Sequence, residues 1–240
     1  MIKLMIVGRR RGGMTLRQCH GYMRDVHGAA VVRFIGEQPH LAPRRYIQNH
    51  VFDGCFRVPD GGADTFAAAR DFVTQVWFDD PAQAAAAMSA PFYRETLQPD
   101  EDRFVDQASV VKLPVVEREV FGRSGRDGAS KVFVMLRAAP GVTLDDLAAA
   151  SAPVWRRLLE EETLGIECVV RNQVLARPGM PAAPVDLVDE VWLSNDDAAL
   201  GLGERWLAIA ASEQLAAMLA PGSVVVLTAR QHVLFAGAAA

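Results

Sequence analysis

The side chains best suited to chemistry in this sequence lie in two short stretches, "HGYMRDVH" and "YIQNH". They are His20, Tyr22, His27, Tyr46, Gln48 and His50. An imidazole has an ordinary pKa of about 6.5 and exchanges a proton near neutral pH. A tyrosine hydroxyl and a glutamine amide supply neutral hydrogen bonds to a carbonyl, enol or phenol oxygen. The combination predicts acid-base chemistry on a small oxygen-containing compound.

The second stretch reads as a β-strand over residues 45–53. Alternation along a strand sends Tyr46, Gln48 and His50 to one face and Asn49 to the other. The three polar groups of the first face are therefore candidates for one site.

The first stretch lies in a helix that is expected to begin at Thr15, because Thr15 and Gln18 have the capping-box spacing. Spacings of three and four predict one buried face, made of Leu16, Cys19, Met23, Val26, Ala30 and Phe34. His20 and His27 lie along this face. If the helix covers the strand face that bears His50, His27 or His20 approaches it; periodicity leaves open which face that is.

The two halves of the sequence resemble each other. "IKLMIVGRRRGGMT" matches "SKVFVMLRAAPGVT", "YIQNHVF" matches "VVRNQVL", and "VTQVWFDD" matches "VDEVWLSN", in the same order. The stretch from Ser109 to Phe121 matches the last strand of the chain. These matches predict a duplication, with one copy over 1–121, a linker over 122–129 and a second copy over 130–240.

Each copy has the predicted element order β-α-β-β-α-β. Such a unit folds as a four-stranded antiparallel sheet with both helices on one face, and two copies can cover each other's bare face. The expected fold class is therefore α+β, with two tandem ferredoxin-like repeats.

The two copies also act as controls for each other. Residues present in both are interpreted as structural: Arg9/Arg137, Thr15/Thr143, Asn49/Asn172 and Trp77/Trp192. Residues present only in the first copy are candidates for a site. His27 corresponds to Trp155, His50 to Gln173, Gln48 to Arg171, Tyr46 to Val169, Tyr22 to Ala150 and His20 to Ala148.

Composition narrows the possible functions. The 240 residues carry a net charge of −4, and the basic residues are spread along the chain, which argues against nucleic acid as a partner. Three cysteines without a C-x-x-C spacing favour a reducing compartment, and we expect a cytoplasmic protein without a membrane span. His50 and Asp53 fall on opposite strand faces, so no metal site is expected.

Several motifs together resemble the EthD-type proteins of the dimeric α/β-barrel superfamily. They are "IKLMIVGRRRGGMTLRQCHGYMRDVHGAAV", "YIQNHVFDG", "VWFDD" and "DEDRFVDQASVVKLPVVEREVF". The resemblance implies an intramolecular barrel formed by the two repeats, with an active cleft in the first. It also implies no cofactor, a small hydrophobic or aromatic ligand, an association with ether degradation, and a possible homodimer of the two-repeat chain.

Our hypothesis makes His50 or His27 the general base and has Tyr46 and Gln48 orient the substrate, for isomerisation, dehydration or cyclisation. Tyr22, His20 and Trp77 are further candidates for substrate binding, although His20 and Trp77 are also readily explained as core residues. A carrier that binds the compound without converting it, and a cofactor-free monooxygenase, stay open. The long hairpin loop over residues 54–71 is expected to serve as a lid.

Overall fold

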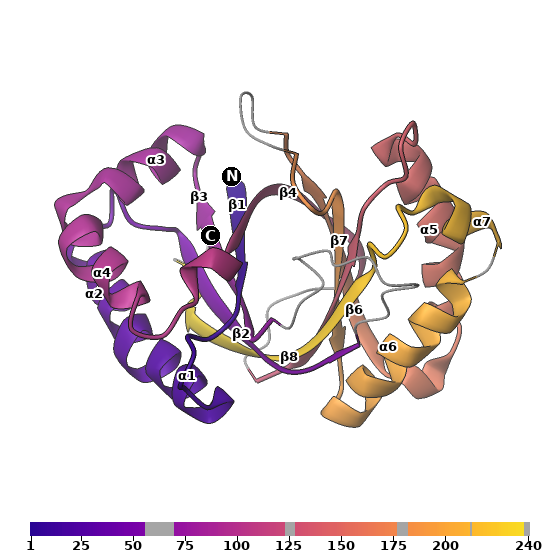
Figure 1. Cartoon of the computed structure of the whole chain (residues 1–240), viewed down its shortest axis with the longest axis horizontal. Coiled ribbons are helices and arrows are strands. Elements are labelled where there is room, and N and C mark those ends of the chain that lie inside the picture. The colour runs from indigo at the N-terminus through magenta and orange to yellow at the C-terminus, as the bar shows by residue number, and fades with distance from the viewer. Residues whose placement is uncertain (56–69, 123–127, 177–181, 212, 238–240) are drawn as a thin grey trace. The chain divides into compact units, whose positions relative to one another are not determined.

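In the computed structural model, the chain is described at residues 1–55, 70–122, 128–176, 182–211 and 213–237 (Figure 1). The first part contains β1 (Ile2–Gly8), α1 (Leu16–Tyr22), η1 (Met23–His27), α2 (Gly28–Glu37), β2 (Arg45–Cys55), β3 (Phe72–Phe78), α3 (Pro81–Ser89), η3 (Tyr93–Leu97), α4 (Gln98–Glu101), η4 (Gln107–Ser109) and β4 (Val111–Gly122). The second contains β5 (Ser130–Leu136), α5 (Leu144–Leu159), η5 (Glu162–Leu164), β6 (Ile166–Val174), β7 (Leu187–Leu193), α6 (Asp196–Ala210), α7 (Glu213–Met218) and β8 (Val225–Phe235).

The strands form one closed barrel in the order β1-β3-β2-β8-β5-β7-β6-β4. The pairs with a defined register are antiparallel. The predicted fold class, two tandem ferredoxin-like βαββαβ repeats with a four-stranded sheet each, is therefore wrong, because the sheet is a single closed one.

The long strands β4 and β8 explain the difference. Residues Val115–Gly122 of β4 pair with β6, while β1 is the other neighbour of β4. Residues Val225–Arg230 of β8 pair with β5, while β2 is its other neighbour. Since each of these strands has partners on both sides, no edge is left at which the sheet could end.

Contacts divide the chain into two compact units that do not coincide with the predicted copies. The first unit comprises the described residues of Met1–His50, Arg70–Pro114 and Gln231–Ala240. The second comprises those of Val51–Ala69 and Val115–Arg230. The linker predicted at 122–129 lies mostly outside the described residues, as does most of the predicted lid at 54–71.

In the first unit, the helical segments α1 to α4 lie on one side of the strands β1, β3 and β2 (Figure 1). The predicted start of the first helix is confirmed: the Thr15 hydroxyl accepts from the Gln18 amide, and the Gln18 side chain accepts from the Thr15 amide. Two helical segments, η1 and η3, are π-helical. A π-turn adds one residue to a helical turn and rotates everything that follows.

This rotation corrects the predicted buried face of the first helix. Cys19, Met23 and Phe34 are buried as expected, but Val26 is 48% exposed and Val31 is buried instead. The period of 3.6 residues holds up to η1 and resumes in a new phase after it.

In the second unit, α5, α6 and α7 gather on one side of their strands (Figure 1). Their apolar faces form a continuous core with β5 and β7, in which Trp155 and Trp206 are the largest side chains. Here α5 is α-helical over its whole length, with a capping box at Thr143 and Asp146.

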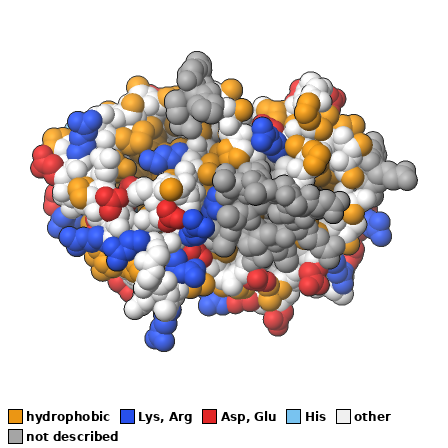
Figure 2. Space-filling model, in the orientation of Figure 1, with side chains coloured by type: hydrophobic (Ala, Val, Ile, Leu, Met, Phe, Trp, Pro, Cys, Tyr) orange, Lys and Arg blue, Asp and Glu red, His pale blue; other side chains and the backbone are white. Residues whose placement is uncertain are grey.

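Charged side chains of both signs are mixed over the described surface of the face drawn in Figure 2. Within the described residues, no helix combines the length and apolar character that crossing a membrane requires.

Gly28 allows the first helix to approach the strands closely. A Cβ atom at this position would lie 2.4 Å from Leu234 Cδ1 and 2.9 Å from the Met23 carbonyl oxygen. We expect Gly28→Ala to lower the free energy of unfolding by about 1 to 3 kcal/mol through overpacking. Urea unfolding followed by circular dichroism measures this change.

Gly36 is the matched control, because it lies in the same α2 and a Cβ there would meet nothing within 4 Å. Gly36→Ala should raise the free energy of unfolding by about 0.5 to 1 kcal/mol, as alanine favours the helix. Equal effects of the two substitutions would contradict the close-approach argument.

Candidate functional site

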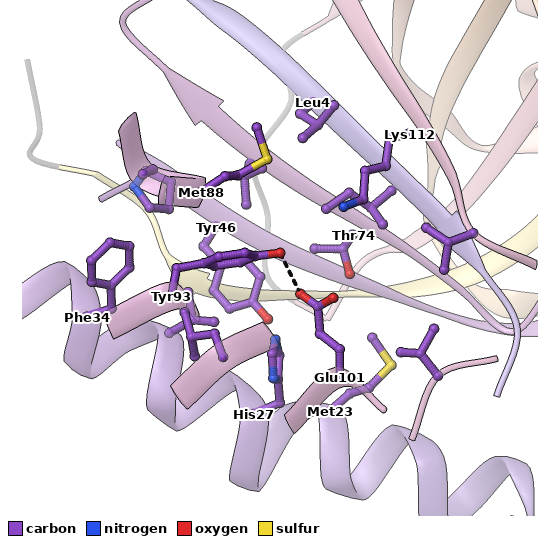
Figure 3. Close-up of a pocket in the computed structure, with 18 of the residues that line it drawn as sticks. Leu4, Met23, His27, Phe34, Tyr46, Thr74, Met88, Tyr93, Glu101 and Lys112 are labelled. Carbon is purple, nitrogen blue, oxygen red and sulfur yellow. Dashed lines mark hydrogen bonds between the residues drawn. The ribbon is translucent and has the colours of Figure 1, made fainter. Parts of the chain in front are cut away.

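The first unit contains a cavity of about 120 Å³ between its helices and strands (Figure 3). Apolar side chains form most of its wall, and its polar side chains are His27, Tyr46, Thr74, Tyr93, Glu101 and Lys112. A buried apolar cavity of about 150 Å³ is known to accept benzene. The space therefore suits a compound with about one aromatic ring.

Both π-helical segments contribute to the wall of this cavity. Met23 and His27 are the first and last residues of η1, and Tyr93 and Leu97 are those of η3. π-Turns inside α-helices often occur at functional sites, since they re-aim side chains that a regular helix would turn away. The unit with the cavity has this irregularity in its first helix, whereas α5 of the second unit has none.

His27 is oriented by a carboxylate. Its Nδ1 lies 3.0 Å from Asp100 Oδ2, and the two side chains are only 12% and 15% exposed. The ring also packs against Phe104, at 5.0 Å between ring centroids. A proton on Nδ1 that is donated to Asp100 leaves a lone pair on Nε2. Figure 3 shows the His27 ring extending from its helix towards Tyr46.

Tyr22 does not line the cavity but holds Asp100 in place. Its hydroxyl donates to Asp100 Oδ1 at 2.5 Å. Burial, with the neighbouring Asp100 carboxylate, raises the pKa of Tyr22, so its hydroxyl keeps its proton for this hydrogen bond. Asp100 therefore accepts from two side chains at once, which fixes both of its oxygens.

Tyr46, Gln48 and His50 form a buried hydrogen-bond chain that reaches the cavity only at Tyr46. Gln48 Nε2 donates to the Tyr46 hydroxyl oxygen at 2.6 Å and to the Met23 carbonyl at 2.7 Å. His50 Nε2 lies 3.0 Å from Gln48 Oε1 and is the donor there, because that oxygen can only accept. Burial raises the pKa of Tyr46. Its hydroxyl is therefore a neutral donor for a ligand in the cavity.

His50 lies outside the cavity, next to two other histidine rings. Its ring centroid is 4.4 Å from those of His20 and His232. Burial, followed by the neighbouring His20, His232 and Arg24, lowers the pKa of His50 to about 2, against a smaller opposing effect of Asp25. Burial also lowers the pKa of His20, whose Nε2 contacts the Asp71 carbonyl oxygen at 2.7 Å. The structure thus does not bring His50 or His20 together with His27 in one cavity.

Trp77 lies on the strand face turned away from the cavity. Its neighbours Val76 and Phe78 on β3 line the cavity, whereas Trp77 packs between Lys3 and Arg45, whose cationic groups are 5.0 and 4.7 Å from the ring centroid. The alternation of a strand accounts for this placement.

Sequence reasoning did not identify Asp100, Tyr93, Glu101, Thr74 or Lys112 as site residues. The Tyr93 hydroxyl donates to Glu101 Oε1 at 3.0 Å (Figure 3), and burial followed by the Glu101 charge raises the pKa of Tyr93. The run "DEDR" after the second helical stretch was the available signal, because acidic residues beside an apolar segment can face a cleft. Among the described residues, no group of three His, Cys, Asp or Glu is placed to hold a metal ion.

The buried His50 makes stability depend on pH. In the folded chain its pKa is about 2, whereas in the unfolded chain it takes up a proton below about pH 6.5. The contribution of His50 to stability is therefore fully present above pH 6.5. It is lost as the pH falls below this value, by about 1.4 kcal/mol per pH unit. Between pH 6.5 and 4.5, the free energy of unfolding of the unmodified protein should fall by about 2 to 3 kcal/mol more than that of His50→Gln.

Urea unfolding at the two pH values measures this difference. The exposed His40 is the control, and His40→Gln should follow the unmodified protein. Parallel losses in all three proteins would show that His50 ionises as easily in the folded chain as in the unfolded one.

Solved structures share this fold over nearly the whole chain. An anthrone oxidase-like protein superimposes with a TM-score of 0.57 at 11% identity, covering 100% of this chain and 96% of its own. A predicted monooxygenase from Lactobacillus acidophilus NCFM gives 0.53 at 11% identity, with coverages of 98% and 97%. A predicted chlorite dismutase gives 0.53 at 10% identity, with coverages of 97% and 96%. At these identities the likeness concerns the fold alone.

No curated protein matches the sequence. The EthD domain family, in contrast, matches residues 11–108, a range that includes His27, Tyr46, Thr74, Tyr93 and Asp100. Residues 11–108 of the chain are therefore similar to the EthD domain.

Proposed function

We propose that this protein is a cofactor-independent acid-base enzyme, of isomerase, dehydratase or cyclase type, for a small hydrophobic carbonyl or phenolic compound. One observation carries the proposal: a histidine oriented by a largely enclosed carboxylate, His27 with Asp100, stands in the wall of an apolar cavity of one-ring size. The EthD domain over residues 11–108 is consistent with it.

His27 acts as the general base in this proposal. Nε2 takes a proton from a carbon next to the substrate carbonyl, or from a phenol, and the electron pair left behind moves onto the substrate oxygen. Asp100 stabilises the imidazolium that forms, as carboxylates do for histidine bases. The Tyr46 hydroxyl, whose oxygen already accepts from Gln48, donates to the negative oxygen.

The proton then leaves His27 in one of two ways. Returned to another carbon of the substrate, it completes an isomerisation; given to a departing hydroxyl, it completes a dehydration as water forms. The apolar wall keeps bulk water from quenching the carbanion-like intermediate. In both cases the histidine ends in its starting state, and no outside oxidant or reductant is needed.

Replacing the base tests the proposal. The unmodified protein should catalyse hydrogen–deuterium exchange at the carbon next to the carbonyl of small aryl ketones in heavy water, followed by proton NMR. His27→Ala should lower this rate by about 10² to 10⁴-fold, the usual contribution of a general base. Asp100→Asn should lower it by about 10- to 100-fold, because the ring loses its orienting carboxylate.

The exposed His40 again provides the control, since His40→Ala keeps the cavity intact. An exchange rate in His27→Ala equal to that of the unmodified protein would exclude His27 as the base.

The rival functions predict other results in the same assay. A carrier would bind the ketones without exchange, a reading that the mostly apolar wall of the cavity also supports. A cofactor-free monooxygenase would consume oxygen with an electron-rich phenol, which an oxygen electrode detects. A monooxygenase named among proteins of this fold is the observation that favours including this second assay.

A further inference from the structure

Lys112 is the one Lys or Arg among the described residues that line the cavity. It belongs to β4, on the sheet side, whereas His27 comes from the helix side (Figure 3). A ligand in the cavity would therefore lie between an orienting base and a cation that belong to opposite walls.

The Lys112 ammonium has no ion-pair partner among the described residues. Glu101 lines the same cavity, but its carboxylate accepts from Tyr93 and forms no ion pair with Lys112. Val110, Val105 and other apolar side chains line the same cavity as the lysine. A cation beside an apolar wall lacks part of its hydration, and an anionic oxygen on a bound ligand would offset that loss.

In the second unit, a cation under the helices is neutralised by a carboxylate of the same unit. Arg171 on β6 forms two hydrogen bonds to Asp189, at 2.8 and 2.9 Å, and Trp155 donates to the same carboxylate. Asp189 pairs with Arg171 across the strands as Thr74 pairs with Gln48 in the first unit. The first unit thus has the neutral hydroxyl of Thr74 at the position where the second has the carboxylate of Asp189.

The corresponding strand of the second unit carries no such lysine either. Val226 of β8 and Val224, which directly precedes this strand, face the helices. Both belong to the apolar core around Trp155 and Trp206. A cation on β4 is therefore not a requirement for packing helices on this sheet.

We propose that Lys112 determines specificity by selecting a one-ring compound with an acidic phenol or enol oxygen, which binds as its anion with the ammonium as counter-ion. This inference rests on the proposed function and names the substrate class of that site. Tyr46 then supplies a second hydrogen bond to the ligand, and His27 receives the proton that the ligand gives up.

4-Nitrophenol is a suitable probe, because its phenolate absorbs visible light and its neutral form does not. Mixed with the unmodified protein, it should ionise at a lower pH than in buffer. 4-Nitroanisole, which has the same ring without the acidic oxygen, measures the affinity that comes from shape alone. Lys112→Met should weaken phenolate binding by about 10- to 100-fold and leave nitroanisole binding unchanged.

Two further variants keep the test decisive if Lys112→Met folds poorly. Glu101→Gln removes the negative charge of the cavity and should shift ionisation of the bound phenol further down. Arg156→Met, at an exposed position on α5, should change neither the binding nor the ionisation of the phenol. The inference is overturned if nitrophenol does not bind, if it ionises as in buffer, or if Lys112→Met binds the phenolate as tightly as the unmodified protein does.

His27→Ala separates this inference from the proposed function. The variant should still bind the phenolate through Lys112 while it loses deuterium exchange. Phenolate binding that depends on Lys112, without exchange by any variant, would leave the specificity inference standing and remove the enzyme proposal. Deuterium exchange, together with phenolate binding that does not depend on Lys112, would leave the enzyme proposal standing and remove the specificity inference.

Discussion

The hydrogen bond from Gln48 to the main chain of the first helix is the interaction on which the candidate site depends. The Met23 carbonyl accepts from Gln48 Nε2 and, in the π-turn of η1, from the amide of Gly28. Gly28 has no side chain and therefore lets the helix approach β2 closely enough for this contact. The same π-turn ends at His27 and aims it at the cavity. If this hydrogen bond were lost, the buried side-chain amide or the main-chain carbonyl would be left without a partner, at a cost of about 1 to 3 kcal/mol. The irregular turn and the strand residue therefore stabilise each other.

The second unit solves the same packing problem with a charged residue. Arg171 replaces the neutral amide, and it donates to the Ala148 carbonyl and the Ser151 hydroxyl of a regular α5. Its charge is matched by Asp189, and Trp155 fills the space beside the pair. A buried ion pair with its hydrogen bonds satisfied rigidifies a core but offers no group to a ligand. The two units therefore differ in the polar group under the helices: Gln48 is bonded to Tyr46, which lines the cavity, whereas Arg171 is paired within the core.

Local patterns in the sequence identified much of this arrangement. The capping box at Thr15, the strand over residues 45–53 and the shared face of Tyr46, Gln48 and His50 were all readable from residue type and spacing. They were readable because capping and strand alternation depend on neighbours within a few positions. The fold class was not readable, because the closure of the barrel depends on partners of β4 and β8 that lie far away in the chain.

By itself, the sequence determined which side chains are capable of acid-base chemistry and that His27, Tyr46 and Gln48 belong to the same half of the chain. Only the tertiary structure decided how these are used: it brings His27 to Asp100, separates both from the buried His50, and adds Lys112 to the cavity wall. The physical reason is that a residue's role at a site depends on burial and on partners across the fold. Asp100 is 73 positions from His27, and the π-turn that turns the ring leaves no periodic signal in the sequence.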